Sequence, residues 1–151
     1  LMACTTSIGP GATNMVTAAA LAHVNRLPVL LLPGDVFAGR QPDPVLQQVE
    51  DFGDATASAN DCFRPVSRFF DRITRPEQIL ASLPPAPAVL LDPADCGPVT
   101  LALPQDVQPE AFACPAPFLA ERVDAIERPR ADRTRLDEAI SRIKSSRRPL
   151  I

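Results

Sequence analysis

Residues 9–14, with the sequence Gly-Pro-Gly-Ala-Thr-Asn, have the residue types that could hold a cofactor or another polar ligand. Two glycines with one residue between them allow a tight turn and a close approach of the backbone to a ligand. A helix that begins at such a turn leaves backbone N–H groups without helical partners, and its positive end favours an anion or a polar group. The segment therefore predicts a ligand-binding turn between a strand and a helix.

Two kinds of nucleotide-binding turn are alternative interpretations of this segment. A phosphate-binding P-loop needs Gly-Lys-Ser or Gly-Lys-Thr after the first glycine, and this chain lacks that triplet. A dinucleotide-binding turn fits Gly9 and Gly11, and Asp35 follows the next strand, where an acidic residue would bind a ribose. Asn14 stands where its third glycine should be, and Pro10 separates the first two. The dinucleotide interpretation therefore remains an alternative with a poor match.

The residues around the turn predict a strand, a helix and a second strand. Residues 1–6 favour a strand, residues 12–25 an alanine-rich helix without a charge in its interior, and residues 28–32 a continuous apolar strand. Continuous apolar runs are typical of parallel strands that are covered on both faces. The three elements predict a βαβ unit with a right-handed crossover.

The rest of the chain predicts further α/β elements and a change of domain. We expect a short helix at residues 45–52, strands at 66–73 and 97–103, and a helix from residue 74 that prolines 84, 85 and 87 end near Leu83. Residues 132–145 predict an amphipathic helix, and a strand opens at residues 150–151. The predicted fold class is α/β: a parallel-sheet domain at residues 1–107, a proline-rich linker at 108–131, and the beginning of a second α/β domain at 132–151.

The net charge, the apolar runs and the cysteine spacing argue against several classes of binding partner. The net charge of −3 argues against nucleic acid. No apolar run reaches the roughly 20 residues that a membrane helix needs. The four cysteines are too widely spaced for a zinc site. The sequence shows no sign of secretion, so we expect reduced thiols in a cytoplasmic protein.

A wider set of motifs resembles the thiamine-diphosphate enzyme family. Residues 6–14 resemble the turn of the pyrimidine-binding domain in acetolactate synthase-like members. Five further segments are similar to the inositol-catabolic diketone hydrolases of this family, namely residues 28–35, 40–48, 64–68, 71–78 and 92–98. The resemblance extends over nearly the whole chain, and is weaker at residues 82–91 and 109–117.

The resemblance implies an enzyme that hydrolyses a carbon–carbon bond of a cyclic diketone with thiamine diphosphate and Mg²⁺. It also implies a homodimer or homotetramer in the cytoplasm. It assigns cofactor binding to one group of residues, with Gln47 nearer the reacting centre: Gly9, Pro10, Gly11, Asn14 and Gln47. From the residues alone, Asn14 could instead cap or pack its helix, and Gln47 could be a solvated helix residue.

No catalytic or metal-binding residue is assigned to this chain. In the family the catalytic glutamate precedes the turn, and the metal motif belongs to a later domain, so the resemblance implies that residues 1–151 alone are inactive. Leu1 and Ile151 stand inside expected strands, which predicts a fragment of a longer protein. The alternatives are an acetolactate synthase-like carboligase and a non-catalytic or dinucleotide-binding α/β domain.

Overall fold

The computed structural model describes residues 1–39, 46–49, 51, 53–54, 56–126 and 128–150, and its centre is a four-stranded sheet. The strands lie in the order β1-β2-β4-β3, and every neighbouring pair is parallel. Their bounds are β1 (Met2–Thr6), β2 (Val29–Asp35), β3 (Phe69–Arg72) and β4 (Val99–Pro104). The predicted α/β fold class is confirmed. Because all four strands run the same way, their carboxyl ends meet at one edge of the sheet.

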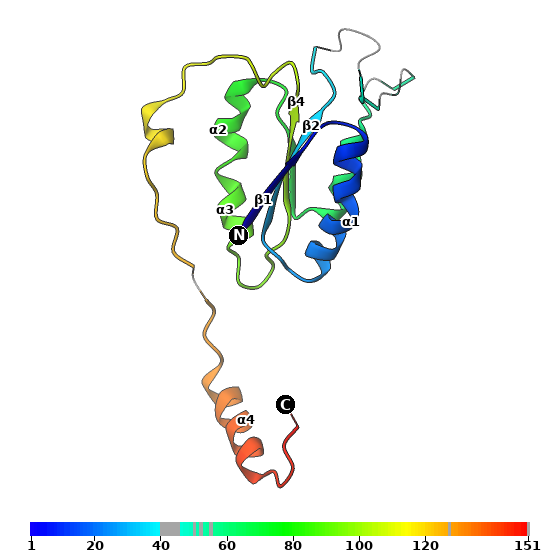
Figure 1. Cartoon of the computed structure of the whole chain (residues 1–151). Helices are drawn as coiled ribbons and strands as arrows, with labels where there is room; N and C mark the ends of the chain where they lie inside the picture. Colours follow the sequence, from blue (N-terminus) through cyan, green and yellow to red (C-terminus); the bar gives the residue numbers. More distant parts are fainter. Residues whose placement is uncertain (40–45, 50, 52, 55, 127, 151) are drawn as a thin grey trace.

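Helices cover both faces of this sheet (Figure 1). Helix α1 (Pro10–Val24) and the 3₁₀ helix η1 (Ala59–Val66) pack on one face. Helices α2 (Ile79–Ser82) and α3 (Pro85–Leu90) pack on the other. On β2, Leu31 belongs to the core beneath α1, whereas Leu30 and Leu32 contact the core beneath α2 and α3. Burial on both sides explains why this strand reads as a continuous apolar run.

The prolines at positions 84, 85 and 87 lie where one helix ends and the next begins. As expected, the first helix stops before them: the 3₁₀ turn η2 (Pro76–Gln78) leads into α2, which ends at Ser82. Pro84 keeps helical angles of φ −58° and ψ −34°, and α3 begins at Pro85. Prolines in the first turn of a helix lose little, because the amide that they lack would have no helical acceptor there. The cluster therefore separates two short helices rather than ending helical structure.

The helix expected at residues 45–52 is wrong for the part of it that the structure describes. Residues 46–49 are irregular, and Gln47 has a φ of 66°, which lies in the left-handed region. Positions 45, 50 and 52 lie outside the described residues. A helix that was not expected follows at η1, where Ser58 and Asp61 form a capping box: the Ser58 hydroxyl accepts from a backbone amide of the first turn, and the Asp61 carboxylate accepts from the Ser58 amide.

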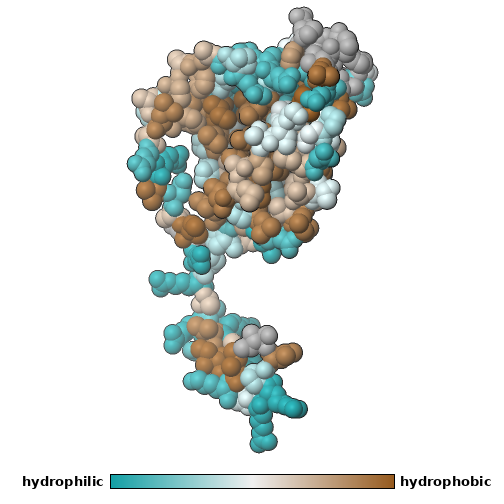
Figure 2. Space-filling view, in the orientation of Figure 1, coloured by the Kyte–Doolittle hydropathy of each residue, from teal (hydrophilic) through white to brown (hydrophobic). Residues whose placement is uncertain are grey.

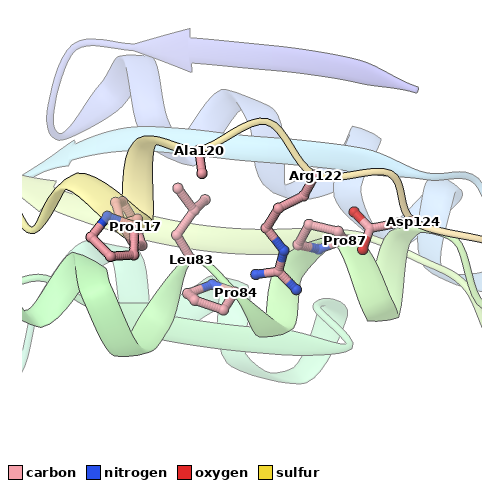
Figure 3. A pocket seen from close by; sticks show the side chains of 8 residues that line it. Leu83, Pro84, Pro87, Pro117, Ala120, Arg122 and Asp124 are labelled. Atoms are coloured by element: carbon pink, nitrogen blue, oxygen red, sulfur yellow. The ribbon is translucent and has the colours of Figure 1, made fainter.

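Beyond β4 the chain crosses α2 and α3 and then leaves the sheet. A short 3₁₀ helix, η3 (Ala116–Leu119), and the residues after it border a cavity of about 240 Å³. Figure 3 shows Leu83, Pro84 and Pro87 facing Pro117 and Ala120 across this cavity, with Arg122 and Asp124 at one end. None of the predicted site residues lines it, so this cavity is separate from the predicted cofactor turn.

Helix α4 (Arg133–Ser145) confirms the helix expected at residues 132–145. All of its residues are exposed, including Leu136, Ile140 and Ile143, and Figure 2 shows hydrophobic surface on this helix. Leu150 lies in no strand, and Ile151 is outside the described residues. The domain boundaries at residues 107 and 131 stay predictions. Among the described residues, no helix has both the length and the apolar character for crossing a membrane.

Candidate functional site

The predicted ligand-binding turn lies at the carboxyl edge of the sheet, between the end of β1 and the start of α1. Gly9 is the residue before the helix, with φ 71° and ψ −123°, angles that L side chains rarely adopt. A Cβ atom on Gly9 would lie 1.7 Å from the backbone oxygen of Gln47. A Cβ on Gly11 would lie 2.6 Å from the Ser7 hydroxyl. Gly9 is therefore required by the way the turn packs, whereas a side chain at Gly11 would displace the Ser7 hydroxyl.

The turn presents polar groups that have no partner. Helix α1 has no side-chain cap, and the amides of Gly11 and Ala12 belong to the first turn, where helices leave donors unpaired. The Thr6 hydroxyl at the end of β1 is buried without a hydrogen-bond partner in the described part of the chain. Such atoms are costly to leave unpaired, so the turn fits a polar ligand better than an empty surface.

Asn14 and Pro10 are exposed, whereas Gly9 is buried. Helix α1 begins at Pro10 and no side chain caps it at Gly9, so Asn14 does not cap the start of this helix. Its exposure also argues against a packing role. The Asn14 amide remains free to meet a ligand, and its assignment to the cofactor stays a prediction.

The structure brings Gln47 to the turn through its backbone. Its carbonyl oxygen faces Gly9, while its side chain is exposed. The neighbouring Gln48 has both amide atoms buried without a partner among the described residues, and the sequence interpretation did not single it out. The repeated glutamine at positions 47–48 is the sequence feature that could have indicated this residue. Residues 40–45 of the motif at 40–48 lie outside the described residues.

Asp35, the candidate ribose-binding residue of the dinucleotide interpretation, is fully buried and already paired. Its carboxylate accepts hydrogen bonds from the Val36 amide at 2.8 Å, the Ser58 hydroxyl at 2.5 Å and Nε of Arg72 at 2.6 Å. The carboxylate is fully buried, so neither of its oxygens reaches a ribose hydroxyl at the surface. This pairing argues against a dinucleotide site.

Arg72 continues the network from Asp35 to Asp61. Burial disfavours the charged forms of Arg72 and Asp61, but the hydrogen bonds and opposite charges of their partners outweigh this effect. The carboxylates of Asp35 and then Asp61 raise the pKa of Arg72 above its ordinary value. The Ser58 amide and the guanidinium groups of Arg64 and Arg72 hold the pKa of Asp61 below its ordinary value. Arg72 and Asp61 therefore keep their charges at neutral pH.

The described residues contain no group of three histidine, cysteine or acidic side chains that could hold a metal ion. The four cysteines are free thiols.

The comparison with known protein families covers the residues of the turn. Residues 1–56 match the family described as "Thiamine pyrophosphate enzyme, N-terminal TPP binding domain", and this range contains β1, the glycine turn, α1, β2 and residues 46–49. Residues 1–56 belong to the N-terminal domain of thiamine pyrophosphate enzymes. Thiamine pyrophosphate is the same compound as thiamine diphosphate. The predicted cofactor residues Gly9, Pro10, Gly11, Asn14 and Gln47 all lie within this domain.

Curated relatives are similar along the whole chain. The 3D-(3,5/4)-trihydroxycyclohexane-1,2-dione hydrolase of Geobacillus thermodenitrificans is 54% identical over 151 residues, which is 100% of this chain and 24% of that protein. Proteins of the same name from Bacillus cereus AH820 and Bacillus thuringiensis Al Hakam are 53% and 52% identical, over 100% of this chain and 23% of each relative. The chain thus spans about a quarter of the length of the relatives that it matches.

We expect Gly9→Ala to destabilise the thiamine pyrophosphate domain. The new methyl group would collide with the Gln47 carbonyl, and the backbone angles alone would cost about 1–3 kcal/mol. Chemical denaturation of the full-length protein, followed by circular dichroism, measures the loss. Gly53→Ala is the matched control, because Gly53 does not have a positive φ and a Cβ there would meet only the Asp51 carboxylate at 3.2 Å, not backbone. Equal stability of the two variants would contradict the close contact.

We expect Asp61→Asn to lower stability at pH 7 by about 1 kcal/mol, after allowing for solvent screening. The pKa of Asp61 is lower in the folded state than its ordinary value of 3.8, so its contribution is complete only above about pH 5, where the unfolded chain is ionised as well. That contribution is lost progressively as the pH falls through the ordinary pKa and then through the folded pKa. Melting curves between pH 7 and pH 3 should therefore converge for wild type and variant. The exposed Asp124→Asn is the control, and a gap that persists unchanged at pH 3 contradicts the assignment.

Proposed function

We propose that this chain is part of a thiamine diphosphate-dependent hydrolase that opens the ring of 3D-(3,5/4)-trihydroxycyclohexane-1,2-dione in myo-inositol catabolism. The observation that carries the proposal is the 54% identity to a protein of that name over all 151 residues. The match of residues 1–56 to a thiamine pyrophosphate domain supports the choice of cofactor. Free polar groups at the Gly9 turn support the place where that cofactor binds.

In this proposal the turn holds the aminopyrimidine ring of the cofactor. Gly9 and Gly11 shape the turn, the exposed Pro10 offers the ring an apolar surface, and Asn14 offers it an amide. Gln47 lies across the turn, on the side nearer the reacting centre. Bound thiamine diphosphate supplies a nucleophilic carbon that makes cleavage beside a carbonyl group possible. The role of this chain is to bind and orient that group, and water completes the hydrolysis.

The remaining features of the proposal belong to the full-length protein. Residues outside this chain would supply the glutamate that contacts the aminopyrimidine and the ligands of Mg²⁺ at the diphosphate. We also propose a homodimer or homotetramer that works in the cytoplasm. The four free cysteines support a reducing compartment.

The direct test is ring opening by the full-length protein. With thiamine diphosphate and Mg²⁺, we expect the cyclic dione to be converted to an open-chain 5-deoxy sugar acid that is heavier by one water molecule. Mass spectrometry and proton NMR follow substrate and product, and a reaction without thiamine diphosphate is the control. Failure to consume the dione overturns the proposal. Formation of acetolactate from pyruvate would identify a carboligase instead, and tight binding of NAD would identify a dinucleotide domain.

We expect Asn14→Ala in the full-length protein to weaken thiamine diphosphate binding about fivefold to tenfold, the value of one hydrogen bond of roughly 1–1.5 kcal/mol. Isothermal titration calorimetry gives the dissociation constant directly. Thr17→Ala is the matched control, because Thr17 is also exposed on α1 but lies one turn further from Gly9. Equal affinities for the Asn14 variant and the control would remove Asn14 from the cofactor site.

A further inference from the structure

Two carboxylates at the carboxyl edge of the sheet anchor the segment that connects β2 to η1. Near its start, the Asp106 carboxylate accepts hydrogen bonds from the amides of Ala38 at 2.9 Å and Gly39 at 2.7 Å. At its end, Ser58 donates its hydroxyl hydrogen to the Asp35 carboxylate at 2.5 Å. Asp35 also accepts from the amide of Val36, the first residue of the segment. The two ends of the segment are therefore fixed to the same edge of the sheet.

Short-range hydrogen bonds stiffen the described residues that lead back from Ser58. The Asp51 carboxylate accepts from the Gly53 amide at 2.8 Å. The Asp54 carboxylate accepts from the amide of Thr56 at 2.9 Å and from its hydroxyl at 2.6 Å. The Ala57 amide donates to the Asp54 carbonyl at 3.1 Å. These hydrogen bonds form local turns at the described residues 51, 53–54 and 56–57.

The anchored segment then meets the cofactor turn. The backbone oxygen of Gln47 and a methyl group of Val49 lie against Gly9, at 1.7 Å and 3.5 Å from the position that a Cβ atom would take there. Val49 also lines a cavity of about 150 Å³ together with Asp51 and Ser58. Asp35 thus fixes Ser58, Ser58 borders the same cavity as Val49, and Val49 lies beside Gly9.

We propose that Asp35 is a positioning residue that holds the Gln47–Val49 backbone against Gly9 and thereby shapes the cofactor turn. Asp35 is fully buried, so it acts through Ser58 and touches no ligand itself. The Arg72 guanidinium balances its charge and connects it to Asp61 on η1. This inference rests on the proposed function, because it requires that the Gly9 turn binds thiamine diphosphate.

Asp35→Asn in the full-length protein tests the inference. We expect the dissociation constant of thiamine diphosphate to rise about tenfold or more, because small displacements at a binding site have large effects. Calorimetry gives this constant without measuring activity, and melting of the cofactor-free protein reports stability separately. Asp71→Asn is the matched control on the same strand as Arg72. The Asp71 carboxylate accepts from Gln78 and Ser82 on the opposite face of the sheet, so this variant should lose stability but bind the cofactor within about twofold of wild type.

Ser58→Ala provides a second variant if Asp35→Asn does not fold. It removes the hydroxyl that joins the segment to Asp35 and leaves the ion pair between Asp35 and Arg72 in place. We expect cofactor binding several-fold weaker than wild type, and Ser58→Thr should restore it because the hydroxyl returns. Wild-type affinity in both Asp35→Asn and Ser58→Ala, with only their melting temperatures lowered, overturns the inference and leaves the proposed function standing. Absence of thiamine diphosphate binding to the wild-type protein overturns both.

Discussion

A fully buried carboxylate is stable only where hydrogen-bond donors surround it. Asp35 is such a carboxylate, so the carboxyl edge of the sheet must bring donors to it. Its donors come from three places: the start of the segment after β2, the residue before η1, and the last residue of β3. Breaking a buried ion pair by removing one partner typically costs about 3–5 kcal/mol. The end of β2, the start of η1 and the end of β3 must therefore lie close together around Asp35. The Gly9 turn lies at the same edge of the sheet.

Much of the sheet could be predicted because its elements bury apolar runs of the right length. The strands around residues 1–6, 28–32 and 97–103 and the helices α1 and α4 follow from such patterns. The 3₁₀ helix η1 was missed because Pro65 lies inside it and proline argues against a helix interior, although Ser58 and Asp61 carry the capping-box signal. The helix expected at residues 45–52 fails where it is described, because Gln47 adopts a positive φ to bring its carbonyl against Gly9.

The site was predictable only as far as local residues determine it. The spacing of Gly9 and Gly11 predicts the turn before α1, since glycine is needed wherever backbone approaches backbone closely. The contact between Gly9 and Gln47 joins segments far apart in sequence, and no local pattern reveals it. Asp35 showed the same limit. Its position after a strand suggested a ribose, whereas its partner Arg72 is known only once β3 is placed in the sheet.

Helix α4 has a consequence for how the chain folds. Three ion pairs along its surface, between Arg133 and Asp137 and between Glu138 and both Arg135 and Arg142, each add only about 0.2–0.5 kcal/mol. A helix of 13 residues is marginal in water, because nucleating the first turn costs more than a few such pairs return. The stripe formed by Leu136, Ile140 and Ile143 is exposed, so burial adds little to the stability of this helix as described. An apolar surface that covered this stripe would therefore stabilise the helical form of the segment.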